Sequence, residues 1–280
     1  HTIDGLYINR TANHQAMFGY AAGATIQNLG LTNVNITNYG NVVGALVAYN
    51  GNSLISNCYS TGTVTCTVGW DTGGLIGAND DNSRVTNCYS TCTVSGDGNT
   101  GGLVGWNVGG SSIIESYSTG NVASNTNVSH IHTGGLVGLM QTSTIEKSYS
   151  TGNVTGKDNA GAFVGSAYSS TIRNCYSLGD VTRASESNSF FGGFVGYNSS
   201  SLLECCYSTA KVFQSATVSW SDGTKGFVGG SEGINTYTAN YFDAELSNQS
   251  SATGATPKTT DQMKVYYTYP GWSNTIWYMD

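Results

Sequence analysis

The sequence predicts an all-β fold, a right-handed parallel β-helix (solenoid) of about seven coils of ~30 residues each, closed by an aromatic C-terminal cap. Three observations predict it. Two short phrases repeat in step along the chain, no 3.6-residue apolar stripe runs through the repeats, and the composition favours strands and turns. The right-handed sense follows from the general preference of parallel crossovers.

The two repeated phrases are Gly-Gly-Leu-Val-Gly and Ser-Tyr-Ser-Thr, which occur together at residues 134–138 and 148–151. The copies of both phrases keep the same spacing, so the two markers advance together. This indicates stacked coils in which equivalent residues form columns. The large residue of the first phrase is Leu46, Leu75, Leu103, Leu136, Phe163, Phe194 and Phe227, and the tyrosine of the second is Tyr59, Tyr89, Tyr117, Tyr149, Tyr176, Tyr207 and Tyr241.

The composition fits a β surface covered with hydroxyls and amides. Charged residues make up 10% of the chain, against roughly 25% in an ordinary globular domain. The chain has 38 glycines and two prolines, Pro257 and Pro270, which both follow the repeats. A polar chain with so few charges favours stacked strands over exposed helices.

Three parts are expected in chain order. Residues 1–40 form an entry coil without the repeat tyrosine, and because the chain opens in the middle of a phrase we expect a fragment of a larger protein. Residues 41–241 form the repeats, with three short strands per coil, in one coil at 101–106, 113–118 and 121–123. Residues 242–280, rich in Trp and Tyr, are expected to cap the open end of the solenoid, where core and strand edges would otherwise be exposed.

Three columns make the predicted core. One is the Leu/Phe column above, one lies four residues before each tyrosine and one lies five residues after it. The positions two and three residues before the tyrosine carry charged side chains in several coils, so we expect these positions to be exposed to solvent. The second core column is Ile55, Val85, Ile113, Ile145, Ile172 and Leu203; the third is Val64, Val94, Val122, Val154, Val181 and Val212; the charged residues are Glu115, Glu146, Lys147, Arg173 and Glu204.

Two questions stay open from the sequence. The tyrosine column can point inward as core, or outward as an exposed ladder able to hold sugars or protein. The cysteines that alternate with serine before the tyrosine can form a column of small buried side chains, or disulfides between neighbouring coils. The possible pairs are Cys58–Cys88, Cys175–Cys206 and Cys66–Cys92, which leaves Cys205 as the odd thiol.

Several functions are disfavoured by the residues. A net charge of −7 without a run of Lys or Arg argues against nucleic acid, and no apolar stretch is long enough to insert in a membrane. The sequence has no HExxH, no GxSxG and no P-loop, and His130 with His132 lacks a third metal ligand. We therefore expect no catalytic residues, no metal and no cofactor, and a chain that is not an enzyme.

The repeats resemble the GLUG motif, named for its Gly-Leu-any-Gly core. The resemblance rests on residues 74–77, 102–105 and 135–138, each followed by the Cys/Ser-Tyr-Ser-Thr phrase, and on a tail at 254–264 like the segment that often follows such repeats. It covers roughly residues 41–241. It implies a secreted or surface-anchored bacterial protein, as in adhesin-like proteins and the non-catalytic part of IgA-cleaving metallopeptidases.

The expected function is adhesion or binding at the cell surface, together with service as a rigid spacer. The expected partners are glycans or surface proteins of host or bacteria, and end-to-end self-association is a further expectation. The candidate ligand-binding aromatics are Trp70, Trp106, Tyr117 and Tyr149.

Two alternatives have weaker support. Parallel β-helices also carry polysaccharide lyases and hydrolases, for which Glu115, Glu146, Arg173, Asp180, Arg183 and Glu204 are the available charged groups. A threonine row at Thr61, Thr91, Thr119, Thr151 and Thr209 suggests binding to ice or a crystal surface, although Leu178 interrupts it.

Overall fold

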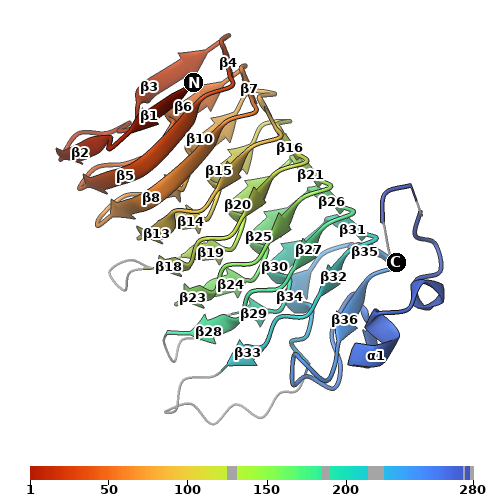
Figure 1. The fold of residues 1–280 in the computed structure, drawn as a ribbon. Helices are drawn as coiled ribbons and strands as arrows, with labels where there is room; N and C mark the ends of the chain where they lie inside the picture. Colours follow the sequence, from red (N-terminus) through yellow and green to blue (C-terminus); the bar gives the residue numbers. More distant parts are fainter. Residues whose placement is uncertain (125–130, 185–189, 214–223, 274, 278–280) are drawn as a thin grey trace.

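A computed structural model describes residues 1–124, 131–184, 190–213, 224–273 and 275–277. The chain winds into a parallel β-helix whose coils stack along one axis, with the C-terminal tail at one end (Figure 1). Every pairing between named strands is parallel. The predicted fold class and the coil number of about seven are confirmed.

The central coils pass through four sheets in the same order, here numbered I to IV. Sheet I has five strands and sheets II and III have eight each. Sheet I contains β9 (Asp71–Gly73), β14 (Asn99–Gly101), β19 (His132–Gly134), β24 (Asn159–Gly161) and β29 (Phe191–Gly192). Sheet II contains β3 (Phe18–Ala22), β6 (Val47–Gly51), β10 (Ile76–Asp80), β15 (Val104–Val108), β20 (Val137–Gln141), β25 (Val164–Tyr168), β30 (Val195–Ser199) and β34 (Val228–Glu232). Sheet III contains β4 (Thr25–Gln27), β7 (Leu54–Ser56), β11 (Arg84–Thr86), β16 (Ser112–Ile114), β21 (Thr144–Glu146), β26 (Thr171–Arg173), β31 (Leu202–Glu204) and β35 (Thr236–Thr238).

Sheet IV has 16 strands and consists of two ladders, one through the tyrosines and one through the valines. The long strands β5 and β8 pair with one another and join the two ladders at the N-terminal end. The joining strands are β1 (Thr2–Asp4), β2 (Tyr7–Arg10), β5 (Gly30–Asn38) and β8 (Tyr59–Cys66). The tyrosine ladder is β12 (Tyr89–Ser90), β17 (Tyr117–Ser118), β22 (Tyr149–Ser150), β27 (Tyr176–Ser177), β32 (Tyr207–Ser208), β36 (Tyr241–Asp243) and β37 (Thr256–Lys258). The valine ladder is β13 (Thr93–Gly96), β18 (Val122–Ser124), β23 (Val154–Gly156), β28 (Val181–Arg183) and β33 (Val212–Phe213).

The coil bends more often than three strands per coil would allow. The piece expected at 113–118 is divided at Glu115, whose backbone is left-handed with φ 50°. The same station, two residues before the tyrosine, is left-handed in its neighbours, and asparagine tolerates this conformation best among non-glycine residues. The prediction of one strand here is wrong because a left-handed residue turns the chain out of the sheet. The equivalent left-handed residues are Asn28, Asn57, Asn87, Lys147, Asn174, Cys205 and Ala239.

The three predicted core columns lie inside the helix, and every member is buried except Val212, which is half-buried. Within the Leu/Phe column the three phenylalanines stack with centroids 4.7 and 4.8 Å apart. The interior also holds a polar column that the repeated phrases did not predict. Asn50 Nδ2 donates to Asn79 Oδ1 over 2.8 Å, and Asn79 Nδ2 donates to Asn107 Oδ1 over 2.7 Å. These bonds satisfy the amide of Asn79, whereas Asn50 Oδ1 and Asn107 Nδ2 have no hydrogen-bond partner within the described part of the chain.

The seven cysteines are free thiols. At the station before the tyrosine the thiol or hydroxyl points inward and donates to the carbonyl two residues earlier. Cys175 Sγ lies 3.0 Å from Arg173 O, and Ser148 Oγ lies 2.8 Å from Glu146 O. The column therefore needs a small buried donor. This confirms the interpretation of these cysteines as small buried side chains and not as disulfides.

The C-terminal segment closes one end and then turns along the side. Strand β37 pairs with β36, while Ala244, Ala252 and Ala255 pack against the end of the core. The short helix α1 (Thr260–Met263), with Thr259 and Gln262 forming its capping box, and the turn η1 (Tyr266–Thr268) follow. The cap is present, but Trp272 and Trp277 lie on the tyrosine ladder and not over the open end. No helix among the described residues is long and apolar enough to cross a membrane.

Candidate ligand-binding site at the end of the tyrosine ladder

The tyrosines of sheet IV form an outward-facing ladder of parallel rings. From Tyr59 to Tyr207, neighbouring centroids are 4.7 to 5.1 Å apart and the ring planes differ by 1 to 6°. The tyrosines are half-buried, whereas the serine after each of them is fully buried, so the two alternate across the strand. Of the two orientations left open by the sequence, the structure supports the exposed ladder.

Stacking decides what the ladder can offer a ligand. The faces of Tyr117 and Tyr149 cover each other at 4.7 Å, so the outer surface presents ring edges and hydroxyls. Burial raises the pKa of Tyr117 and Tyr149, and it raises that of Tyr176 to about 12, so these hydroxyls stay neutral at physiological pH. A sugar that stacks on a ring face must therefore find a face elsewhere.

The C-terminal tail adds a second row of rings at one end of the ladder, in which Trp272 is stacked on both sides and the end ring Trp277 on one of them. Tyr269, Trp272 and Trp277 stack in a row, with both neighbouring centroid distances at 4.4 Å. Trp277 lies 5.6 Å from the ring of Tyr207 and 6.2 Å from that of Tyr176, tilted by 57° and 54°. Trp272 Nε1 donates to Ala239 O over 2.7 Å, which fixes the row to the last coil.

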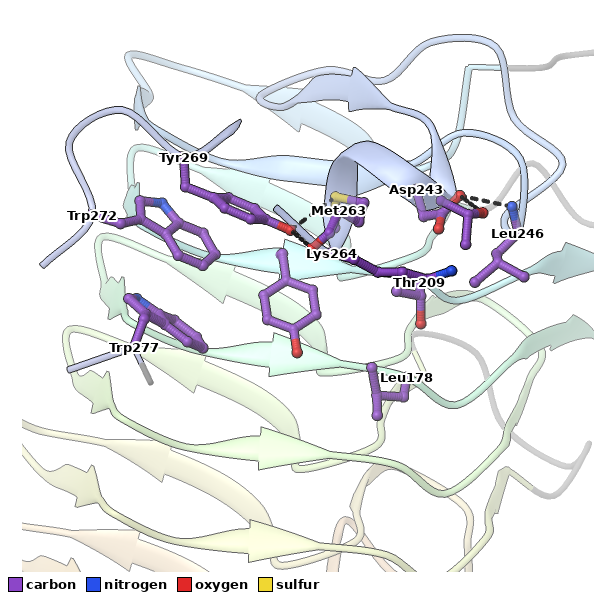
Figure 2. Close-up of a pocket in the computed structure, with 11 residues that line it drawn as sticks. Leu178, Thr209, Asp243, Leu246, Met263, Lys264, Tyr269, Trp272 and Trp277 are labelled. Atoms are coloured by element: carbon purple, nitrogen blue, oxygen red, sulfur yellow. Dashed lines mark hydrogen bonds between the residues drawn. The ribbon is translucent and has the colours of Figure 1, made fainter. Parts of the chain in front are cut away.

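A pocket of about 290 Å³ opens where this row meets the ladder. Figure 2 shows Trp272 and Trp277 on one side, Asp243 and Leu246 on the other, and Leu178 below. Its walls are mostly apolar and aromatic, with a few polar groups, as is common in small-molecule sites. The lining residues are Leu178, Tyr207, Thr209, Asp243, Leu246, Thr260, Met263, Lys264, Tyr269, Trp272 and Trp277.

One carboxylate oxygen of Asp243 accepts hydrogen bonds, and the other accepts none from the described residues. Oδ1 accepts from the backbone N–H groups of Glu245 and Leu246 over 3.0 and 2.9 Å and from Thr260 Oγ1 over 3.1 Å. Oδ2 is buried and has no hydrogen-bond partner within the described part of the chain. A buried carboxylate oxygen without a donor is costly, so Asp243 is held at this position at some expense of stability.

Trp277 lines a second pocket on the ladder, of about 320 Å³. That pocket is more polar, and it contains the exposed Lys147–Glu115 ion pair, whose atoms are 3.6 Å apart, together with Asn174. One indole therefore separates an aromatic pocket from a polar pocket along the same face. An extended ligand could occupy both.

The four aromatic residues named from the sequence are not brought together. Trp70 is 58% exposed in the bend before β9, Trp106 is half-buried on β15 of sheet II, and Tyr117 and Tyr149 lie in sheet IV. Neither tryptophan lines the pockets described above. Their role in binding stays a prediction.

The tail aromatics were expected from the sequence only as a cap, and Asp243, Leu246 and Met263 were missed. The one available signal was Leu178, which replaces a threonine of the row beside the tyrosines and forms part of the pocket.

Other residues weighed from the sequence have structural partners. Arg173 Nε pairs with Glu204 at 2.9 Å on the surface. His132 Nδ1 lies 2.7 Å from Ser166 Oγ, and His130 lies outside the described residues. Among the residues that the structure describes, no group of three His, Cys, Asp or Glu could hold a metal ion.

Comparison with known proteins confirms the repeat motif. The model of the GLUG motif matches residues 39–65, 69–95, 129–155 and 158–182. The chain therefore carries GLUG motifs, and the structure shows coils of the same build outside these stretches, at β15 to β18 and at β30 to β33. No curated protein matches the chain.

One similar solved structure is described as "a putative immunoglobulin A1 protease from Bacteroides ovatus". The identity is 21%, the TM-score is 0.55, and the match covers 84% of this chain and 67% of that chain. At this identity the likeness shows the fold alone.

This neighbour corrects one expectation. From the sequence we expected a chain that is not an enzyme, because no catalytic motif was found, whereas a similar fold occurs in a protein described as a putative protease. The absence of familiar motifs in a repeat fold is therefore not a sound reason to exclude catalysis.

Proposed function

We propose that this chain is an extracellular β-helix module that binds a glycan at the end of its tyrosine ladder and holds that site on a stiff body. The position of Trp277 carries the proposal, because it separates an aromatic pocket from a polar one on a single face. Several sugar units in a row would meet apolar walls, one indole and polar groups in turn.

The chemistry of the two pockets suits carbohydrate. Sugar rings have apolar C–H faces that pack on Trp and Tyr, and hydroxyls that need both donors and acceptors. The ammonium of Lys264 and the hydroxyl of Thr209 can donate to a sugar hydroxyl, and the Thr209 oxygen can also accept from one. These groups stand at the rim of an otherwise apolar space, where they would set the orientation of the ligand.

The spacer role rests on the regular stacking of the coils. Sheets II and III each run through eight parallel strands without an internal break. Such a solenoid extends in one direction as coils are added, so it can hold a binding site away from its attachment point.

The test is a glycan-array and mucin-binding screen of the wild-type chain and Trp277→Ala. We expect saturable binding that falls at least about tenfold in the variant, the loss of about 1.4 kcal/mol. Trp70→Ala is the comparison variant, because Trp70 is a candidate from the sequence that lies away from these pockets. A loss of binding in Trp70→Ala alone would contradict the site at Trp277.

A second variant is needed because Trp277→Ala could weaken binding by releasing the C-terminal tail from the ladder. Leu178→Thr restores the residue found at this station in other coils, so it should fold normally while removing an apolar wall of the pocket. Weaker glycan binding in both variants supports the site. Binding that is absent in the wild type, or unchanged in both variants, contradicts it.

A further inference from the structure

A second aromatic pocket lies on sheet II, away from the tyrosine ladder. It has a volume of about 420 Å³, and the described residues that line it are Asn159, Tyr168, Phe190, Tyr197, Ser231 and Glu232. These residues come from β24, β25, β30 and β34 and from the residue before β29. The proposed glycan site does not include any of them.

Three rings stand around this space without stacking. Tyr168 and Tyr197 are tilted by 48° with centroids 5.7 Å apart, and Phe190 and Tyr197 by 36° at 5.0 Å. Tilted rings leave faces open to a shared space, unlike the parallel rings of the tyrosine ladder. The faces of such rings are negative in potential and attract cations.

Glycine at position 230 makes room for one of these rings. A Cβ at Gly230 would lie 1.9 Å from Cδ1 of Phe190, so the Phe190 ring packs directly on the backbone of β34. At the equivalent station of the neighbouring strand stands Tyr197 itself. The pocket therefore depends on a small residue next to two large ones.

The single charged side chain among the described lining residues is a carboxylate. Tyr197 Oη donates to Glu232 Oε2 over 2.6 Å, which positions the carboxylate at the edge of the rings. The same bond is the main reason why the pKa of Tyr197 is raised, to about 12. At neutral pH the pocket thus combines neutral phenols with one negative charge.

We propose that this pocket binds an alkylammonium group, either a quaternary ammonium such as choline or the side chain of a lysine. Three aromatic rings grouped beside one carboxylate match the chemistry by which proteins hold ammonium ions. The net charge of −7 favours the approach of a cation as well.

The chain contains a natural control for this site. Tyr49 Oη donates to Asp80 Oδ2 over 2.7 Å, and Tyr49 and Asp80 occupy the stations of Tyr197 and Glu232 in an earlier pair of coils. There, however, Tyr49 stacks on Tyr20 at 4.7 Å with a tilt of 26°, so its ring face is covered. This second tyrosine–carboxylate pair lacks the open rings.

The experiment is a calorimetric titration of the whole chain with choline chloride, Nα-acetyl-lysine amide and 3,3-dimethyl-1-butanol, the neutral isostere of choline. We expect binding of at least one of the two ammonium compounds and at least tenfold weaker binding of the alcohol. Glu232→Gln should weaken ammonium binding by tenfold or more, and Asp80→Asn should leave it unchanged.

The two ammonium compounds distinguish a small quaternary ligand from a lysine side chain. Equal binding of the alcohol, no binding of either ammonium compound, or equal losses in Glu232→Gln and Asp80→Asn would overturn the proposal. Failure here leaves the glycan proposal intact, because the variants of the two tests share no residue.

Discussion

Thr142 adopts a left-handed backbone conformation, with φ 49°, in the bend between sheets II and III. A β-branched side chain is poorly suited to this region, where its Cβ crowds the backbone. In other coils the left-handed residues of this bend are Asn52, Asn82, Gly110, Ser169 and Ser200, none of which is β-branched. The residue types at this position of the coil are therefore selected by the left-handed backbone conformation, and not by a side-chain contact.

The change Thr142→Asn should raise the free energy of unfolding by about 1 kcal/mol, because asparagine tolerates the left-handed region better. Urea unfolding measures this difference. Thr144→Asn, in the extended backbone of β21, is the control and should not stabilise. A lower midpoint for Thr142→Asn would contradict the role given to the bend.

Asp71 shows a second residue-level conflict. It is buried on β9, and desolvation raises its pKa to about 6 although Asn99 Nδ2 donates to it over 2.8 Å. An unfolded aspartate titrates near pH ~3.9. Between these values the folded state binds more protons than the unfolded state, so the free energy of unfolding falls as pH rises from about 4 to 6.

Asp71→Asn should therefore stabilise the protein at pH 7.5, by up to ~3 kcal/mol, and change it much less at pH 4. The new amide oxygen can still accept from Asn99, and Asn159 shows that asparagine fits this station. Unfolding in urea at both pH values tests the prediction. A gain that is equal at both pH values would assign the effect to something other than the charge.

At the scale of the element, the first glycine of the Gly-Gly-Leu phrase forms the corner between sheets I and II. A Cβ on Gly134 would lie 2.0 Å from Val137 O and 2.7 Å from Gly165 N of the next coil. The second glycine is replaced by alanine at Ala45 and Ala162, whereas the first is kept at Gly44 and in the five coils that follow. The corner thus requires glycine because two backbones meet there.

Gly134→Ala should lower the free energy of unfolding by ~3 kcal/mol, since the corner must move apart to admit the methyl group. Thermal or urea unfolding measures the loss. Gly51→Ala is the control, because its Cβ would meet only the Tyr49 ring at 3.2 Å and Asp81 beyond it. Equal losses in the two variants would show that the corner is not special.

For the whole molecule, the tail is joined to the repeats mainly through the last coils. Trp272 is buried, bonds to Ala239 O and stacks between Tyr269 and Trp277. In a solenoid each coil contacts only its neighbours, so a local change need not spread. The tail can therefore detach while the body stays folded.

Trp272→Ala should speed amide hydrogen exchange in residues 259–273, consistent with the loss of about 3 kcal/mol of anchoring. Protection in β10, β15 and β20 should stay unchanged. Val265→Ala, at a half-exposed position in the same tail, should alter little. Loss of protection throughout the body would show that the tail stabilises the entire solenoid.

The sequence alone determined the repeat, the parallel β-helix and the core columns. A residue that recurs at a fixed station in every coil must meet the same neighbours in every coil, so burial and exposure repeat with it. This is why periodicity is enough to assign Ile113, Val122 and Leu103 to the interior, and Glu115 and Lys147 to water. The small donor column at Cys175 and Ser148 follows from the same periodicity.

Only the tertiary structure decided which way the tyrosines face, where the coil bends and where the tail lies. A half-polar ring such as Tyr117 fits either side of a strand, and the left-handed residue Glu115 has no sequence signal of its own. The contacts of Trp277 with Tyr207, and of Phe190 with Tyr197, join segments that follow no common period. Repetition fixes what each coil shares with the next. Both proposed sites combine such residues with ones that do not repeat, and their positions therefore depend on packing across the folded chain.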